Sequence, residues 1–185
     1  MVAIPVGIAS AIVVGGVAQG AVPVSFSISG TSFTMAGSAL NGSDFSQYGG
    51  VAKLQSGKEE PVAIANIGSA TITDLCQAVI QSTPLGKVGL VITAGDAGTP
   101  VKASNLQIGM TDLKGDATFT NIRIGADAST VITDAKGSAG DFGQDSQGIL
   151  LKNFSQTAYS TTASTLQLTN MHMKVTTDGS GCPAQ

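Results

Sequence analysis

Charged side chains are scarce in this sequence. They make up 11% of the 185 residues, against about 25% in an average soluble globular protein. The nine basic residues stand scattered between Lys53 and Lys174, so no basic stripe is available to neutralise phosphates. Tryptophan is absent and aromatic residues are 4% of the chain, which leaves few side chains that could stack on bases. These deficits argue against nucleic-acid binding.

Residue types that carry out catalysis are also few. The single histidine, His172, stands between two methionines, and this alternation predicts a strand with the imidazole on its polar face. No serine has glycine at both second-neighbour positions, so the Gly-x-Ser-x-Gly elbow of many serine hydrolases is absent. We therefore expect no catalytic residue, no cofactor and no enzymatic activity.

Acidic residues gather in one glycine-rich stretch, which contains Asp134, Asp141 and Asp145. Calcium needs six to eight oxygen ligands, and the spacing of these aspartates matches no recognised calcium loop. We expect a solvated turn here. The pair Glu59-Glu60, beside a proline, is interpreted in the same way, and no metal site is predicted.

The first part of the chain is apolar and uncharged. Residues 2–24 contain Ser10 and Gln19 as their only polar side chains, and a helix of this length crosses a bilayer. We predict a retained transmembrane anchor over residues 1–24, with an extracytoplasmic β-domain over residues 25–185. A cleaved signal peptide, cut before Ala21, is the alternative. A signal peptide needs a basic segment that the sequence lacks, so we expect that Met1 does not begin a complete export signal.

Small residues recur at helical spacing along the predicted anchor. Such stripes let helix backbones approach closely in lipid, where packing drives association. We therefore expect a homo-oligomer. The predicted helix-packing residues are Ala3, Gly7, Ala11, Gly15, Gly16 and Gly20.

Two cysteines, Cys76 and Cys182, lie far apart and form no Cys-x-x-Cys or histidine-spaced motif, so a metal or redox site is not expected. In an oxidising compartment they are expected to form a disulfide. The alternative is a pair of free thiols. A disulfide would place the β-domain outside the cytoplasm and would hold the C-terminal tail against the body.

After the leader, short apolar alternations predict β-strands, for example at Leu106, Ile108 and Met110, and at Val88, Leu90 and Ile92. Glycine is frequent, with 24 residues, and turn signals such as Asn41-Gly42, Gly49-Gly50 and Gly179-Ser180-Gly181 stand between the strands. The only candidate helix is residues 72–82. We expect an all-β fold, an antiparallel β-sandwich; a β-solenoid is the alternative, and a long-range disulfide favours the sandwich.

A short element recurs, in which an apolar residue, Thr or Lys, Asn or Asp and a second apolar residue follow one another. In two copies, FTNIRI from Phe119 and LTNMHM from Leu168, the apolar alternation shifts across the asparagine, which predicts a β-bulge or corner. Asn and Asp tolerate the backbone conformation that such corners need. The copies begin at Ile72, Met110, Phe119, Ile132, Leu151 and Leu168.

Several blocks, among them AQGAVPVSFSISG, ATITDLCQAVIQSTPLGKVGLVITAG and NFSQTAYSTTASTLQL, resemble a family of actinobacterial export-targeted proteins of unknown function. The resemblance covers nearly the whole chain. Family members usually carry a basic segment before the apolar leader, which this sequence lacks. Some are labelled cholesterol esterase, and the missing hydrolase residues give that label no support. The resemblance implies a cell-envelope location and paired cysteines, and it carries over no catalytic residue.

Taken together, the sequence predicts a non-enzymatic, single-pass protein of the cell membrane that forms a homo-oligomeric structural assembly in the envelope. Its expected partners are membrane lipid, further copies of itself and other envelope membrane proteins. The alternative is a lipid- or sterol-binding module at the outer face of the cytoplasmic membrane.

Overall fold

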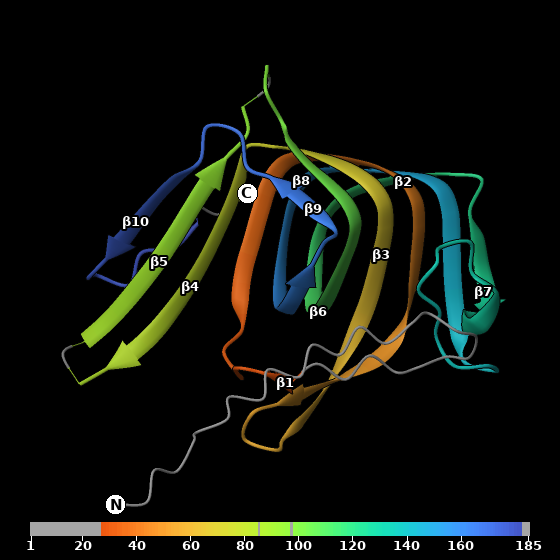
Figure 1. The fold of residues 1–185 in the computed structure, drawn as a ribbon, viewed down its shortest axis with the longest axis horizontal. Helices are drawn as coiled ribbons and strands as arrows, with labels where there is room; N and C mark the ends of the chain where they lie inside the picture. Colours follow the sequence, from red (N-terminus) through yellow and green to blue (C-terminus); the bar gives the residue numbers. More distant parts are fainter. Residues whose placement is uncertain (1–26, 85, 97, 183–185) are drawn as a thin grey trace, which may run out of the picture.

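The computed structural model describes residues 27–84, 86–96 and 98–182, which form an all-β protein (Figure 1). The fold class predicted from the sequence is therefore confirmed for these ranges. Within them no helix is long and apolar enough to cross a membrane. The elements are β1 (Ser27–Ile28), β2 (Phe33–Leu54), β3 (Glu59–Thr73), β4 (Leu75–Thr83), β5 (Gly86–Ala94), β6 (Val101–Thr120), β7 (Arg123–Asp127), the 3-10 turn η1 (Ala128–Thr130), β8 (Phe142–Thr162), β9 (Thr165–Gln167) and β10 (His172–Thr176).

Four long strands close into a small antiparallel barrel. β2 pairs with β3, β3 with β6, β6 with β8, and β8 returns to β2. The barrel closes at β6 because residues 107–110 pair with β3 on one edge and with β8 on the other, within ladders that cover 101–110 and 107–120. The architecture thus differs from the expected sandwich of two sheets. Its barrel strands run antiparallel to their neighbours, so the stacked coils of a solenoid are also not what the chain forms.

The barrel interior is filled by the alternate residues of these strands. Leu106, Ile108 and Met110 are 1%, 2% and 4% exposed, which confirms the alternation predicted for this stretch. Complete burial of such a side chain stabilises a fold by about 1.5–3 kcal/mol. The largest members of the same core are Leu40, Phe45, Ile67, Ile72, Leu75, Ile149, Leu151 and Phe154.

Aspartates and asparagines occupy every left-handed backbone position that is not glycine in the described ranges, at Asp44, Asp74, Asn105, Asn121, Asn153 and Asn170. Four of them belong to the recurrent element. Asn121 separates β6 from β7, and Asn170 lies between β9 and β10, so the predicted corners at both places are confirmed. The copies that begin at Met110 and Ile132 do not show this conformation at their aspartates.

Residues 72–82, the one candidate helix of the sequence, are instead the end of β3 and most of β4. Asp74 has φ 53° and turns the chain between the two strands, with its backbone N–H donating to the carbonyl of Gly95 at 2.6 Å. Because both neighbouring runs are buried on one side, their apolar residues imitate a helical spacing. The candidate helix is therefore not formed, and these residues follow the all-β expectation.

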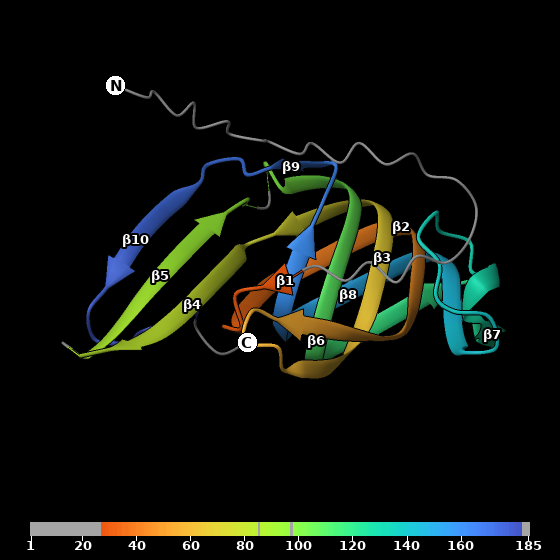
Figure 2. The same cartoon turned by 60° about the horizontal axis from the view of Figure 1, so that its bottom comes forward.

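Three strands extend beyond the barrel and form what we call the wing: β4, β5 and β10. The sheet order is β10-β5-β4-β2, and β4 joins the barrel through residues 34–36 of β2 (Figure 2). At the other end of the sheet, β7 pairs with β8 beside η1. β10 and β7 are thus the two ends of this sheet path.

Candidate functional site

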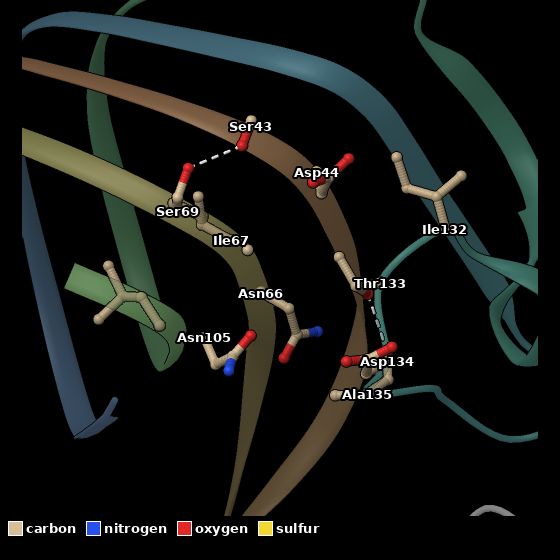
Figure 3. Close-up of a pocket in the computed structure, with 12 residues that line it drawn as sticks. Ser43, Asp44, Asn66, Ile67, Ser69, Asn105, Ile132, Thr133, Asp134 and Ala135 are labelled. Carbon is tan, nitrogen blue, oxygen red and sulfur yellow. Dashed lines mark hydrogen bonds between the residues drawn. The ribbon is translucent and has the colours of Figure 1, made fainter. Parts of the chain in front are cut away.

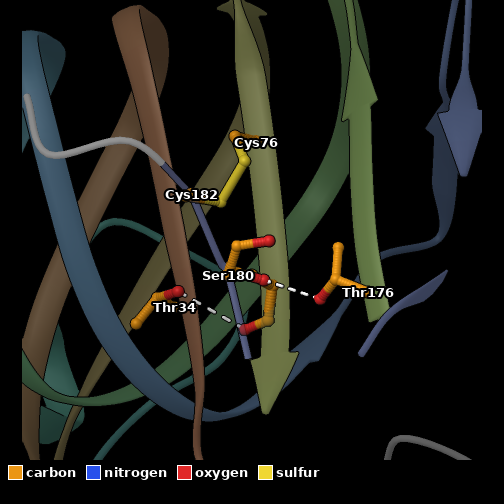
Figure 4. The surroundings of a disulfide bond; sticks show 6 residues. Thr34, Cys76, Thr176, Ser180 and Cys182 are labelled. Carbon is orange, nitrogen blue, oxygen red and sulfur yellow. Dashed lines mark hydrogen bonds between the residues drawn. A yellow bond between two sulfur atoms is a disulfide. The ribbon is translucent and has the colours of Figure 1, made fainter. Parts of the chain in front are cut away.

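One face of the wing is covered by the C-terminal tail. Cys76 on β4 and Cys182 form a disulfide with Cα atoms 5.7 Å apart, as the sequence predicts for an oxidising compartment (Figure 4). The two cysteines pack with Ala78 and Val91, which are 2% and 3% exposed. Thr176 Oγ1 donates to the carbonyl of Ser180 at 2.9 Å, which holds the turn that brings the tail back. This side of the wing is therefore closed by the chain itself.

The opposite side, which we call the open face, carries Val79, Val88, Leu90, Ile92, Met173 and Val175. Near the barrel the same face belongs to the core, since Leu75 and Ala94 are only 3% and 6% exposed. Further out, Met173 and Val175 are 51% and 67% exposed. The other side chains on this face of β4 are Gln77, Gln81 and Thr83, so the face carries no charge.

The open face thus continues the barrel core outward, from the partly buried Val79, Val88, Leu90 and Ile92 to the exposed Met173 and Val175. The alternation of Val88, Leu90 and Ile92 was recognised in the sequence, but their pairing with Met173 and Val175 of β10 joins segments more than 80 residues apart. Contiguous apolar surface of this kind marks an interaction site in soluble and membrane-associated proteins.

His172 lies on the tail-covered side of β10, opposite Met173, as its alternation predicts. It is exposed, and no carboxylate or serine contacts its ring in the described ranges. Within those ranges, no group of three or more His, Cys, Asp or Glu side chains is placed to hold a metal ion. Glu59 and Glu60 begin β3 and form ion pairs with Lys53 and Lys58.

The acidic stretch with Asp134, Asp141 and Asp145 is only partly the solvated turn that the sequence predicts. Asp145 is 1% exposed and accepts hydrogen bonds from Nε and Nη2 of Arg123, at 2.8 and 2.5 Å, and from the backbone N–H of Ile132 at 2.7 Å. The Arg123 hydrogen bond is the main cause that lowers the pKa of Asp145, against the effect of burial. Asp134 and Asp141 are exposed, as expected. Asp145 therefore holds the loop after η1 against the barrel.

That loop and the bent barrel strands enclose a groove of about 540 Å³ (Figure 3). Asp44 on β2, Gly68 on β3 and Asn105 on β6 lie between paired positions of their strands and are themselves unpaired in the register. Asp44 and Asn105 have left-handed backbones. A Cβ atom on Gly68 would lie 3.1 Å from that of Asp44, so this glycine allows the three strands to bend together. The opposite wall is formed by residues 132–135.

Buried polar side chains support the floor of the groove. Asn66 is 5% exposed; its Nδ2 donates to Ser46 Oγ at 3.2 Å, and its Oδ1 accepts from Gln107 Nε2 at 2.8 Å. The Ser46 hydroxyl also hydrogen-bonds Thr133 across the groove base. Burial raises the pKa of the Tyr48 hydroxyl, and its hydrogen bond with Asn66 offsets part of this rise. No sequence pattern predicts this network, because its members lie on three strands and a loop.

The predicted anchor and its helix-packing residues, Ala3, Gly7, Ala11, Gly15, Gly16 and Gly20, lie outside the described residues. The structure therefore leaves the boundary between residues 1–24 and 25–185 as a prediction.

By its fold, this protein is a closed antiparallel β-barrel with a disulfide-tied wing and one open aliphatic face. A protein-family model described as "Family of unknown function (DUF6230)" matches residues 29–183. The chain therefore belongs to that family. The match agrees with the resemblance noted in the sequence in one respect, namely that the family is one of unknown function. No curated protein and no solved structure matches the chain.

Proposed function

We propose that this chain is a non-enzymatic, membrane-anchored protein of the cell envelope that forms a homo-oligomeric structural assembly. The observation that carries the proposal is the open face of the wing. It continues the hydrophobic core, is uncharged, and leaves Met173 and Val175 exposed in the described chain. Burying such a surface against another protein removes apolar area from water and stabilises association.

A second copy of the same chain is the partner that fits this face best. A two-fold axis places the same surface on both partners, so an uncharged aliphatic sheet face meets another without electrostatic repulsion. Two sheet faces pack at about 10 Å when their side chains interdigitate, as in a β-sandwich. Because the open face ends at β10, such packing would also cover Met173 and Val175, its most exposed members.

The location rests on two further features. The Cys76–Cys182 disulfide is consistent with an oxidising compartment outside the cytoplasm. The apolar leader, with its stripe of small residues, supports a single-pass anchor that assists association in the membrane plane. The resemblance to actinobacterial export-targeted proteins points the same way. Membrane lipid and other envelope membrane proteins are the remaining proposed partners.

Native mass spectrometry of the full chain in detergent tests the proposal. We expect a discrete oligomer for the natural sequence, and at least tenfold weaker association for Met173→Asp, because a carboxylate would have to be buried in an apolar interface. His172→Asp is the matched control: it adds the same charge one residue away, on the opposite side of β10. A natural chain that is monomeric at all concentrations would contradict the proposal.

A lipid- or sterol-binding module remains the second candidate, because acyl chains would also cover the open face. The barrel interior gives it less support, since core side chains fill it. A monomer that carries stoichiometric lipid, lost in Met173→Asp and retained in His172→Asp, would establish this candidate instead.

A further inference from the structure

The groove between the bent strands and the loop after η1 has the size and fixed geometry of a small-molecule site. Its volume of about 540 Å³ lies within the range of about 300–1,000 Å³ that ligand sites occupy. The barrel strands form one wall. The loop that forms the other is held by the buried Asp145, which accepts from the backbone N–H of Ile132, and by its exposed partner Arg123, which donates to the carbonyl of Thr130. The groove is therefore a feature of the rigid barrel and does not depend on association through the wing.

Hydrogen-bond acceptors dominate the lining. The carboxylates of Asp44 and Asp134 are exposed to the groove, and in the described ranges neither has an ion pair or a side-chain hydrogen bond (Figure 3). The donors of the Asn66 amide are taken by Ser46 and Tyr48, while its Oδ1, which accepts one bond from Gln107, keeps a second lone pair. A ligand of this groove must therefore donate several hydrogen bonds.

The groove is also lined by neutral polar and aliphatic side chains, which favour an uncharged ligand that donates hydrogen bonds over a simple cation. The hydroxyls of Ser43 and Ser69 are bonded to each other at 2.8 Å, and Asn105 donates to Ser164 at 3.1 Å and keeps a second N–H and its carbonyl. Ile132, 43% exposed, adds an aliphatic edge. A sugar ring supplies the complement, because it has several hydroxyls that donate and accept and a C–H face for aliphatic contact.

We propose that this groove binds a polyhydroxylated ligand, a saccharide unit, with Asp44 and Asp134 accepting hydrogen bonds from its hydroxyl groups. Asn66 and Asn105 orient the ring from the barrel side, and Ile132 contacts its C–H face. Charged acceptors form stronger hydrogen bonds with hydroxyls than neutral ones do, so the two carboxylates contribute most of the affinity.

Isothermal titration of the full chain in detergent with two probes, maltotriose and N-acetylglucosamine trisaccharide, tests the proposal. We expect saturable one-to-one binding of at least one probe, and about tenfold or greater weakening in the double variant Asp44→Asn, Asp134→Asn. Asparagine retains the left-handed conformation at position 44, so the variant preserves the bend. Asp116→Asn, an exposed aspartate on β6 outside the groove, is the control and should bind like the natural chain.

Failure of both probes to bind, or unchanged binding by the double variant, would overturn the proposal. Binding of spermidine but of neither saccharide, lost in the double variant, would overturn it in favour of a cationic ligand. If the protein is retained on insoluble glycan and is released by the trisaccharide that it binds, the saccharide unit belongs to a polymer. Binding of the trisaccharide without such retention would assign it to a free sugar. The oligomeric state of each variant, measured in parallel, separates this result from the proposed assembly.

Discussion

Single asparagines and aspartates determine where the long strands turn. Asn153 lies in the middle of β8 with φ 47°, and its side chain is exposed and makes no hydrogen bond within the described ranges. The register between β2 and β8 includes the pairs Gly37–Phe154 and Ala39–Lys152. Asn153 and Ser38 lie between these pairs and are left out of the register, so one residue bends the strand. The left-handed backbone costs most residues about 1–2 kcal/mol, and asparagine less.

We predict that Asn153→Ala lowers the free energy of unfolding by about 1 kcal/mol, because alanine tolerates the left-handed conformation less well than asparagine does. Asn153→Gly should be close to neutral, since glycine adopts this region freely. Chemical denaturation of the purified chain measures both. Asn41→Ala, at an exposed β2 position without positive φ, serves as the control and should change little. Equal losses for Asn153→Ala and Asn153→Gly would assign the effect to the amide group instead.

The buried carboxylate of Asp145 links stability to pH. Its pKa is lowered in the folded chain, chiefly by Arg123, so its contribution is present above the ordinary aspartate pKa and is lost as pH falls through the lowered value. Replacing Asp145 with Asn leaves Arg123 without its carboxylate and the loop without a charged acceptor.

We predict that Asp145→Asn costs about 1.5–3 kcal/mol of stability at pH 7, the range for hydrogen bonds to charged groups. The difference from the natural chain should shrink as pH falls below about 4, where the carboxylate of the unfolded chain becomes protonated, and disappear below the lowered pKa of the folded chain. Unfolding midpoints measured from pH 7 to pH 2 provide the comparison. Asp141→Asn, an exposed aspartate of the same stretch, should follow the natural chain at every pH. A gap that stays constant with pH would rule out the electrostatic cause.

At the scale of elements, the wing depends on its link to the tail. The cystine connects positions 106 residues apart, and a loop of that length restricts the unfolded chain by roughly 4–5 kcal/mol in the chain-entropy model. The covered face of the wing has only a small apolar cluster of its own, formed around Cys76, Ala78 and Val91. The wing should therefore be the element most sensitive to reduction.

We predict that reduction, or the double variant Cys76→Ser, Cys182→Ser, lowers stability by about 2–5 kcal/mol. It should also increase amide hydrogen exchange in β4, β5 and β10 before exchange in the barrel strands β2, β3, β6 and β8. Hydrogen-exchange mass spectrometry with and without reductant measures this order. The double variant should not respond to reductant, and this insensitivity is the control. Uniform exchange across wing and barrel would show that the disulfide stabilises the fold globally.

Local patterns in the sequence predicted elements more reliably than their arrangement. The alternation of Leu106, Ile108 and Met110 indicated a strand, and Asn121 and Asn170 indicated corners, because periodicity and left-handed tolerance are properties of neighbouring residues. The groove and the Asp145–Arg123 pair were not predicted, since their members lie on separate elements and single charges carry no partner information. The candidate helix at 72–82 arose because one aspartate shifts the apolar period between two strands.

At the scale of the whole molecule, closure of the barrel escaped prediction for a related reason. A sandwich and a closed barrel place the same alternating residues inside, and they differ only in whether β8 returns to pair with β2. That pairing joins residues 95 to 125 positions apart, from Tyr48–Gly143 to Phe33–Ala158. No local pattern distinguishes a strand that bends from a strand that ends.

The cystine also determines how the molecule carries mechanical load. If tension acts between the N-terminal side of β1 and the chain beyond Cys182, the force bypasses the residues enclosed by the disulfide. Those 106 positions, which would extend by roughly 350 Å if released, add no length while the bond is intact. Only the segment from β1 to Cys76 is able to unravel. The protein would then behave under tension as a short, stiff tether, and a reducing environment would convert it into a long, compliant one.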